Sequence, residues 1–221
     1  MSSGEITFTL WADIACPWTH AAVSRWRRER TRRGLEERVL LELRSFPLEL
    51  FNRRPTPKRV LDAEIPVAGS LAPEAGWQSW QRQPYEYAVS TLLALEAVHA
   101  AKEQGLRASE ELDFALRRGF FGASRNVSLH HEIVEVADEC EGVDAEAIDA
   151  ALRSGSARRS IFEDMEEAQN SNVKGSPHFF LGEENWHNPG VQMKWIGKSG
   201  EGFPVIEKDD PEVFAQMFDG I

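Results

Sequence analysis

The residues most able to do chemistry in this 221-residue chain form a short segment near its start, in which Cys16 is followed by Pro17, Trp18 and Thr19. The sequence predicts that Cys16 lies where a strand ends and a helix begins, because proline suits the first helical position. Free backbone N–H groups and the helix dipole favour a thiolate there, and cysteines in such places titrate at about 3.5–7.5. Cys16 is therefore the candidate nucleophile, with an inert buried cysteine as the alternative.

The residues next to Cys16 could support this chemistry. The hydroxyl of Thr19 could donate a hydrogen bond to the sulfur, or Thr19 could simply pack in the first helical turn. We expect Trp18 to be exposed as a contact surface, with a buried anchor as the alternative. Asp13 could help to relay protons or could satisfy the local backbone. We expect His20 to face solvent.

The first part of the chain follows a strand–helix–strand pattern. Residues 5–11 alternate polar and apolar side chains and are rich in β-branched and aromatic types, which predicts a strand. Residues 21–33 are typical of a helix that ends near Gly34, and residues 39–46 predict a second strand. Because a helix connects the two strands, we expect them to lie parallel in one sheet.

The middle of the chain is predicted to be loop and then helix. Residues 52–84 are rich in proline, glycine and polar residues, which indicates a loop or lid with a short helical piece. Residues 85–172 have helical periodicity, with Ser128 and Asp144 as plausible N-caps. We expect one helical face to be formed by Tyr85, Val89, Leu92 and Leu93.

Strand patterns return near the end of the chain. Residues 178–181 predict a strand, and residues 191–196 could be its hairpin partner, with residues 183–190 as the loop between them. A short final helix is predicted to begin at Pro211.

This order of elements resembles a thioredoxin fold interrupted by a helical domain, as in the DsbA family. The segment from Asp13 to Thr19 is similar to the D-x-x-C-P-W-C motif of the FrnE-like branch, and residues 173–180 resemble its V-x-G-x-P-x-F segment. The proline of that segment is cis in the family and faces the active cysteine. The resemblance therefore places Pro177 opposite Cys16.

The resemblance implies an α/β protein with a thioredoxin-like fold and an inserted all-helical domain. The thioredoxin-like domain would be discontinuous and would comprise residues 1–51 and 173–221. Residues 52–172 would form the loop and helical insertion domain.

The resemblance also implies where a substrate binds. A cis Pro177 would leave backbone groups of Ser176 able to pair with an extended peptide or with glutathione. Pro17 and Trp18 would contact the substrate beside the sulfur.

The sequence departs from the family pattern at one important position, because Thr19 replaces the second active-site cysteine. A Cys-x-x-Thr site cannot close an internal disulfide. What remains is half of thiol–disulfide exchange, in which a thiolate attacks a disulfide and another thiol releases the mixed species.

The other candidate residues are interpreted as structural. Cys140 follows an apolar helix face in acidic surroundings, which indicates a core thiol and not a resolving thiol. The adjacent residues His130 and His131 point to different sides of a helix, so no metal site is expected. Residues 185–190 are interpreted as a turn first and a ligand contact second, and the basic run at residues 25–33 as a solvated helix face.

Composition limits the partners. The 25 basic and 36 acidic residues give a formal net charge of −11, which disfavours binding to nucleic acid or to an anionic membrane. Two cysteines and no signal peptide or apolar stretch of spanning length predict a cytoplasmic protein. We expect a monomer or a homodimer.

Three functions are compatible with these observations. The first is a thiol–disulfide oxidoreductase that acts as a monothiol on glutathione or protein mixed disulfides, with no covalently bound cofactor and with glutathione as a possible co-substrate. The second, also implied by resemblance, is a glutathione-dependent isomerase or transferase of the 2-hydroxychromene-2-carboxylate isomerase or kappa-class type. That branch typically has serine at the position of Cys16. The third is a non-catalytic module that binds a partner through the groove at Pro177.

Overall fold

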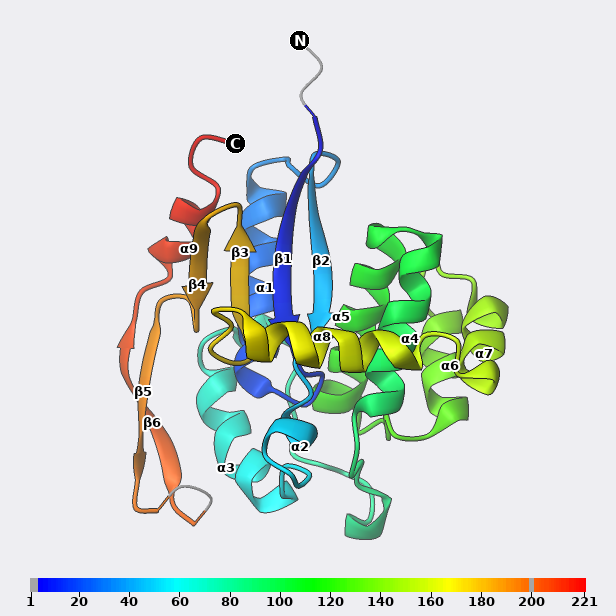
Figure 1. Cartoon of the computed structure of the whole chain (residues 1–221). Helices are drawn as coiled ribbons and strands as arrows, with labels where there is room; N and C mark the ends of the chain where they lie inside the picture. Colours follow the sequence, from blue (N-terminus) through cyan, green and yellow to red (C-terminus); the bar gives the residue numbers. More distant parts are fainter. Residues whose placement is uncertain (1–3, 199–200) are drawn as a thin grey trace.

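The computed structural model describes residues 4–198 and 201–221, which form a mixed α/β fold (Figure 1). Its strands are β1 (Ile6–Ala12), β2 (Val39–Ser45), β3 (His178–Leu181), β4 (Glu184–His187), β5 (Val191–Ile196) and β6 (Phe203–Asp209). Its α-helices are α1 (Pro17–Arg32), α2 (Leu48–Phe51), α3 (Lys58–Gly69), α4 (Leu92–Ala101), α5 (Leu106–Ala123), α6 (His130–Asp138), α7 (Ala145–Ser154), α8 (Arg158–Asn170) and α9 (Glu212–Met217).

The predicted strand–helix–strand unit is confirmed. Strand β1 pairs in parallel with β2, from Ile6 opposite Val39 to Ala12 opposite Ser45. Helix α1 connects the two strands and is anchored by Trp26, whose fully buried ring packs 5.5 Å from the ring of Phe8. Strand β1 and helix α1 together fix the position of the turn that carries Cys16.

The late strands pair differently from the prediction. Strand β3 runs antiparallel to β1, and its hairpin partner is β4, so the sheet has the order β2-β1-β3-β4. The prediction that residues 191–196 pair with β3 was wrong, because a two-residue turn at Gly182, with φ of +58°, reverses the chain earlier. Strand β4 lies at the edge of the sheet and is largely polar, so its residues lack the apolar pattern that predicts a strand.

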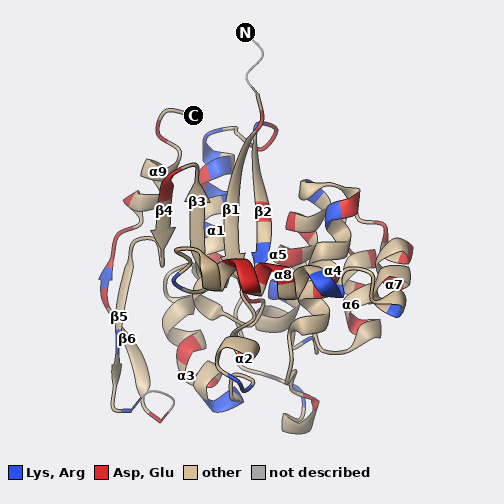
Figure 2. Ribbon diagram, viewed as in Figure 1, with Lys and Arg blue, Asp and Glu red and all other residues tan. Residues whose placement is uncertain are grey.

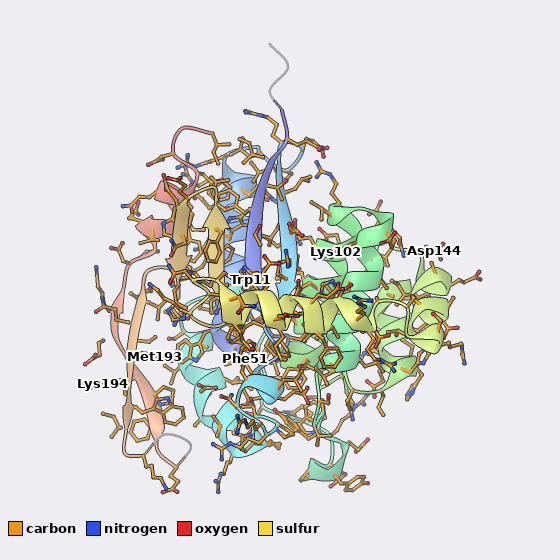
Figure 3. All side chains as sticks on the ribbon, viewed as in Figure 1. Trp11, Phe51, Lys102, Asp144, Met193 and Lys194 are labelled. Carbon is orange, nitrogen blue, oxygen red and sulfur yellow. The ribbon has the colours of Figure 1, made fainter. Side chains whose placement is uncertain are left out.

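Strands β5 and β6 form a separate two-stranded sheet. Figure 1 shows this hairpin extending beside α3, away from the four-stranded sheet. Met193 of β5, labelled in Figure 3, and Ile206 of β6 pack on the apolar cluster that contains Cys16. The hairpin is therefore part of the surroundings of the site.

Helices α4 to α8 form the predicted helical block, and two details of the prediction differ. Asp144 is confirmed as the N-cap of α7, because its side chain accepts a hydrogen bond from the Ala147 N–H at 3.0 Å. Leu129, not Ser128, is the N-cap of α6. Tyr85 and Val89, which are 85% and 66% exposed, precede α4 and share no face with it. We attribute this to Pro84, which opens a short 3-10 helix followed by extended backbone.

The segment of residues 52–84 is more ordered than predicted, because it contains the 12-residue helix α3. Helix α3 packs against α1 and β6, while α8 lies across one end of the sheet (Figure 1). Asp164 of α8 accepts the Ser45 N–H of β2 at 2.6 Å. The division of the chain into two domains stays a prediction.

The basic run in α1 is a solvated face only in part, at exposed residues such as Arg28 and Arg32. Arg25 and Arg30 are buried, and each forms a bidentate ion pair, Arg25 with Asp209 and Arg30 with Glu110. The prediction was wrong for these two residues because acidic partners far along the chain fold onto α1. Within the described residues, no helix has the length and hydropathy needed to cross a membrane.

Candidate functional site

Cys16 is the N-cap of α1, one residue before Pro17. The carbonyl of Cys16 accepts the first helical hydrogen bond, from the His20 N–H at 3.1 Å. Its side chain is only 3% exposed. The predicted strand-to-helix position is confirmed, but the sulfur lies below the surface.

The loop before β3 comes directly against this sulfur. The Ser176–Pro177 peptide bond is cis, and the Cys16 thiol donates a hydrogen bond to the Ser176 carbonyl oxygen at 3.2 Å. Residues that are 160 positions apart in the sequence are thus in contact. The antiparallel pairing of β3 with β1 produces this contact, since it places the start of β3 beside the end of β1.

Thr19 and Ser176 form a pair of hydroxyl groups next to the sulfur. Thr19 Oγ1 lies 2.8 Å from Ser176 Oγ, which also accepts the Asp13 N–H at 2.9 Å. Thr19 is completely buried. Its hydroxyl therefore fixes the cis-proline loop, in addition to lowering the pKa of the Cys16 thiol through a hydrogen bond.

The Cys16 thiol differs from the expectation of a low pKa. Burial raises its pKa above the ordinary value, despite hydrogen bonds from Thr19 and Ser176 that act in the opposite direction. The nearby carboxylate of Glu64 raises the pKa further. A thiolate at a helix start is favoured only if water or dipoles can solvate it, and this site is covered.

Asp13 anchors the local backbone. Its carboxylate accepts the Ala15 N–H and the Leu48 N–H, each at 2.8 Å, and the hydroxyl of Thr91. Burial raises the pKa of Asp13, and these hydrogen bonds oppose the increase. The arrangement corresponds to the second of our two interpretations of Asp13, in which it satisfies local backbone groups.

Two expectations about exposure were wrong. Trp18 is only 8% exposed, and its indole N–H donates to Glu64 Oε1 at 3.2 Å. His20 is completely buried and stacks on Phe121, with ring centroids 5.1 Å apart. Burial lowers the pKa of His20 to about 3. Helices α3 and α5 cover the first turn of α1 from two sides, which the local sequence cannot show.

The sequence analysis missed Glu64 and Arg117. The buried guanidinium of Arg117 pairs with Asp113 one turn earlier in α5 and donates to the Asp13 carbonyl oxygen at 2.7 Å. The Asp–Arg spacing of four residues is a visible signal for the pair, but its contact with the Cys16 turn is tertiary. No sequence pattern pointed to Glu64 as a neighbour of Cys16, since its segment was interpreted mainly as a loop.

Other groups of reactive residues in the described part of the chain do not form a second site. The Cys140 thiol donates to the Val136 carbonyl oxygen at 3.1 Å, and burial with nearby Glu111 and Glu139 raises its pKa to about 11. Among residues 4–198 and 201–221, no group of histidine, cysteine and acidic side chains could hold a metal ion.

A buried serine, histidine and aspartate also meet between β2 and the helical block. Ser45 Oγ and Asp164 Oδ2 both lie 3.0 Å from the same nitrogen, Nε2 of His99. A proton relay requires the base and the orienting carboxylate to use different ring nitrogens. This cluster therefore fixes the packing of α4 and α8 on the sheet.

The sheet order, the helix that starts at Cys16 and the cis peptide bond opposite it define a thioredoxin-like protein with inserted helices. A family model described as a DSBA-like thioredoxin domain matches residues 7–197. The chain belongs to this DsbA-like family.

Solved structures share the fold. A probable DsbA oxidoreductase from Streptomyces coelicolor is 24% identical, with a TM-score of 0.68 over 96% of this chain and 88% of its own. The cytosolic disulfide reductase DsbM from Pseudomonas aeruginosa, also solved with GSH, is 16% identical, with a TM-score of 0.63 over 82% and 88%. A 2-hydroxychromene-2-carboxylate isomerase is 16% identical, with a TM-score of 0.61 over 82% and 88%. No curated protein matches the sequence.

Proposed function

We propose that the protein is a thiol–disulfide oxidoreductase in which Cys16 acts as a single nucleophile on mixed disulfides of glutathione or of proteins. The observation that carries the proposal is the contact between Cys16 Sγ and the Ser176 carbonyl oxygen beside a cis proline. This arrangement leaves one sulfur facing a segment of backbone suited to an extended thiol or peptide substrate.

The proposed reaction has two exchange steps. The Cys16 thiol loses its proton, and the thiolate attacks one sulfur of the substrate disulfide. A bond forms between Cys16 and that sulfur, the substrate S–S bond breaks, and the leaving thiolate takes up a proton. A second thiol, of the glutathione class, then attacks the mixed disulfide and restores Cys16 as a thiol.

The chain's own residues have distinct roles in this proposal. Thr19 and Ser176 provide hydrogen bonds that favour the thiolate, while Trp18 packs in the buried apolar cluster of the sulfur and Pro17 opens helix α1 directly after it. Asp13 supports the turn through its backbone contacts. His20 is neutral and buried, so it supports packing and takes no part in proton transfer.

The test compares Cys16→Ser with Cys140→Ser. We expect Cys16→Ser to abolish both the glutathione adduct, measured by intact-protein mass spectrometry with oxidised glutathione, and the reduction of a mixed disulfide. Cys140→Ser should retain both, because the Cys140 thiol, just beyond α6, donates a hydrogen bond to the Val136 carbonyl oxygen. Adduct formation on Cys140, or exchange that persists in Cys16→Ser, would refute the proposal.

The second candidate is a glutathione-dependent isomerase or transferase. The observation in its favour is the pair of hydroxyl groups, Thr19 and Ser176, which could hold the thiol of a bound glutathione beside residue 16. This candidate predicts that Cys16→Ser keeps substantial turnover of an isomerisable or electrophilic substrate. A partner-binding module would instead show no thiol activity and would bind its partner less tightly after Pro177→Ala. The cytoplasmic location stays a prediction.

A further inference from the structure

The sulfur of Cys16 is covered by helix α3 and the segment that follows it. The apolar cluster that contains Cys16 is formed by the buried residues Trp18, Ala21, Ala68, Leu71, Ala72 and Ala75, with Leu48, Val67, Trp77, Val191, Met193 and Ile206 partly buried against it. Four of these belong to the stretch from Ala68 to Ala75, directly after or at the end of α3. A disulfide must contact the sulfur in order to react, so the described state cannot carry out the exchange.

Two side chains of α1 form hydrogen bonds to α3 and to the segment that follows it. The indole N–H of Trp18 donates to Glu64 Oε1 in the middle of α3, at 3.2 Å. The guanidinium of Arg25 donates through Nε to the Leu71 carbonyl oxygen, at 2.7 Å, just beyond the end of α3. Arg25 also forms a bidentate ion pair with Asp209 of β6, so the hydrogen bond to Leu71 comes from a side chain that β6 holds as well. The hydrogen bond of Trp18, by contrast, depends on Glu64 alone.

Helix α3 itself is weakly embedded. Of its 12 residues only Leu61 and Ala68 are fully buried, whereas α1 buries eleven of its 16 residues. Pro66 lies inside the helix, where it removes a backbone hydrogen bond. Elements with few buried contacts are the ones that open locally while the rest of a protein stays folded. In Figure 1, α3 lies at the edge of the molecule, between the β5–β6 hairpin and α2.

We propose that α3 is a gate over Cys16, which opens as a local unit and is held closed by the hydrogen bond between Trp18 and Glu64. Its purpose rests on the proposed function, since an open gate would admit a disulfide to the sulfur. Its existence is a property of the folded protein and can be measured without any turnover.

The experiment measures the reaction of Cys16 with an aromatic disulfide reagent, dithionitrobenzoate, as a function of urea. Every protein carries Cys140→Ser, so that Cys16 is the one thiol. A gate predicts a slow rate at low urea that changes little with urea, because local opening exposes little surface. At higher urea the rate should join the steep dependence of global unfolding.

The role of the hydrogen bond between Trp18 and Glu64 is tested by two variants that both remove the charge of Glu64. Glu64→Gln keeps an oxygen that can accept the indole N–H, whereas Glu64→Ala does not. The reaction of Glu64→Ala at low urea should therefore be about 2- to 12-fold faster than that of Glu64→Gln, as expected for the loss of one hydrogen bond. Because the charge change is the same, its effect on the thiol cancels. Asp62→Asn removes an exposed carboxylate of the same helix and should leave the rate unchanged.

Three results would overturn the gate. The rate could follow global unfolding at every urea concentration, Glu64→Ala and Glu64→Gln could react equally fast, or Asp62→Asn could accelerate the reaction as much as Glu64→Ala. Failure of the proposed function is distinguishable, because exchange that persists in Cys16→Ser would leave a measured gate intact. Conversely, a glutathione adduct on Cys16 without local opening would refute the gate alone.

Discussion

At the scale of single residues, the site combines a thiol with groups that pull its protonation in opposite directions. Hydrogen bonds from Thr19 and Ser176 favour the thiolate of Cys16, while burial and the carboxylate of Glu64 favour the thiol. Desolvation is the largest of these effects, so the thiol is protonated in the closed state. Opening of α3 would hydrate the sulfur and remove Glu64 from it, and both changes would lower its pKa.

His20 supplies a pH-dependence that can be measured at the same scale. Burial, with Arg117 as a second cause, lowers its pKa from 6.5 to about 3, so the folded protein holds it neutral while the unfolded chain protonates it. The contribution of neutral His20 to the free energy of unfolding is therefore fully present above pH 6.5. It is lost as the pH falls from 6.5 towards about 3, by about 1.4 kcal/mol per pH unit.

We expect His20→Phe to remove that part of the loss, since a neutral aromatic ring fits beside Trp77 and Phe121. Urea unfolding at several pH values gives the slopes. His131→Phe, at an exposed position, is the matched control and should keep the slope of the unsubstituted protein. Equal slopes for His20→Phe and the unsubstituted protein would show that His20 is not the titrating group.

At the scale of elements, helix α5 supports the turn that carries Cys16. Arg117 is completely buried, and it bridges Asp113 of α5 and the carbonyl oxygens of Asp13 and Ile14. The inserted helices thus contribute to the shape of a site that the sequence assigns to the thioredoxin-like part. A buried ion pair of this kind is costly to break from one side, because the remaining charge stays uncompensated.

Arg117→Met should destabilise the protein by about 3–5 kcal/mol, because it leaves Asp113 buried without its cation. The second variant, Arg117→Met combined with Asp113→Leu, should recover part of the loss. Urea unfolding measures both. Arg153→Met, which breaks an exposed Asp–Arg pair of the same spacing in α7, should have little measurable effect. A loss no larger than that of Arg153→Met would contradict the role of Arg117.

At the scale of the whole molecule, charged side chains tie the helical block to the sheet. Arg30 of α1 pairs with Glu110 of α5, and Arg44 of β2 pairs with Asp164 and Glu167 of α8. Figure 2 shows the acidic stretch of α8 lying across the end of β2. Trp11, labelled in Figure 3, belongs to the same apolar cluster as Ala168 of α8. These contacts predict that the two parts unfold together.

The tryptophans allow this prediction to be tested directly. All seven lie outside residues 85–172, but the rings of Trp77 and Trp80 pack on Phe121 and Phe120 of α5. With Trp77 and Trp80 both replaced by phenylalanine, the remaining fluorescence reports mainly on the sheet and its covering elements, whereas circular dichroism at helical wavelengths is dominated by the helical block. We expect both signals to follow one urea transition with the same midpoint. Two separate midpoints would show that the block and the sheet are independent domains.

The sequence by itself determined the candidate nucleophile, its place at the start of a helix, the parallel strand pair and the block of helices. Each of these depends on local patterns: a proline after Cys16, alternation in β1, and helical periodicity in α5 to α8. The cis-proline segment was found through the resemblance of residues 173–180 to a family motif. Polar β4 and the β5–β6 pairing gave no such local signal.

Only the tertiary structure decided how the site behaves. Trp18, His20 and Arg25 were expected to be exposed on the first helix, yet each is buried by an element from elsewhere in the chain. The same packing covers Cys16 and reverses the expected direction of its pKa. Solvation of a group depends on what folds over it in three dimensions, and a one-dimensional pattern does not contain that information.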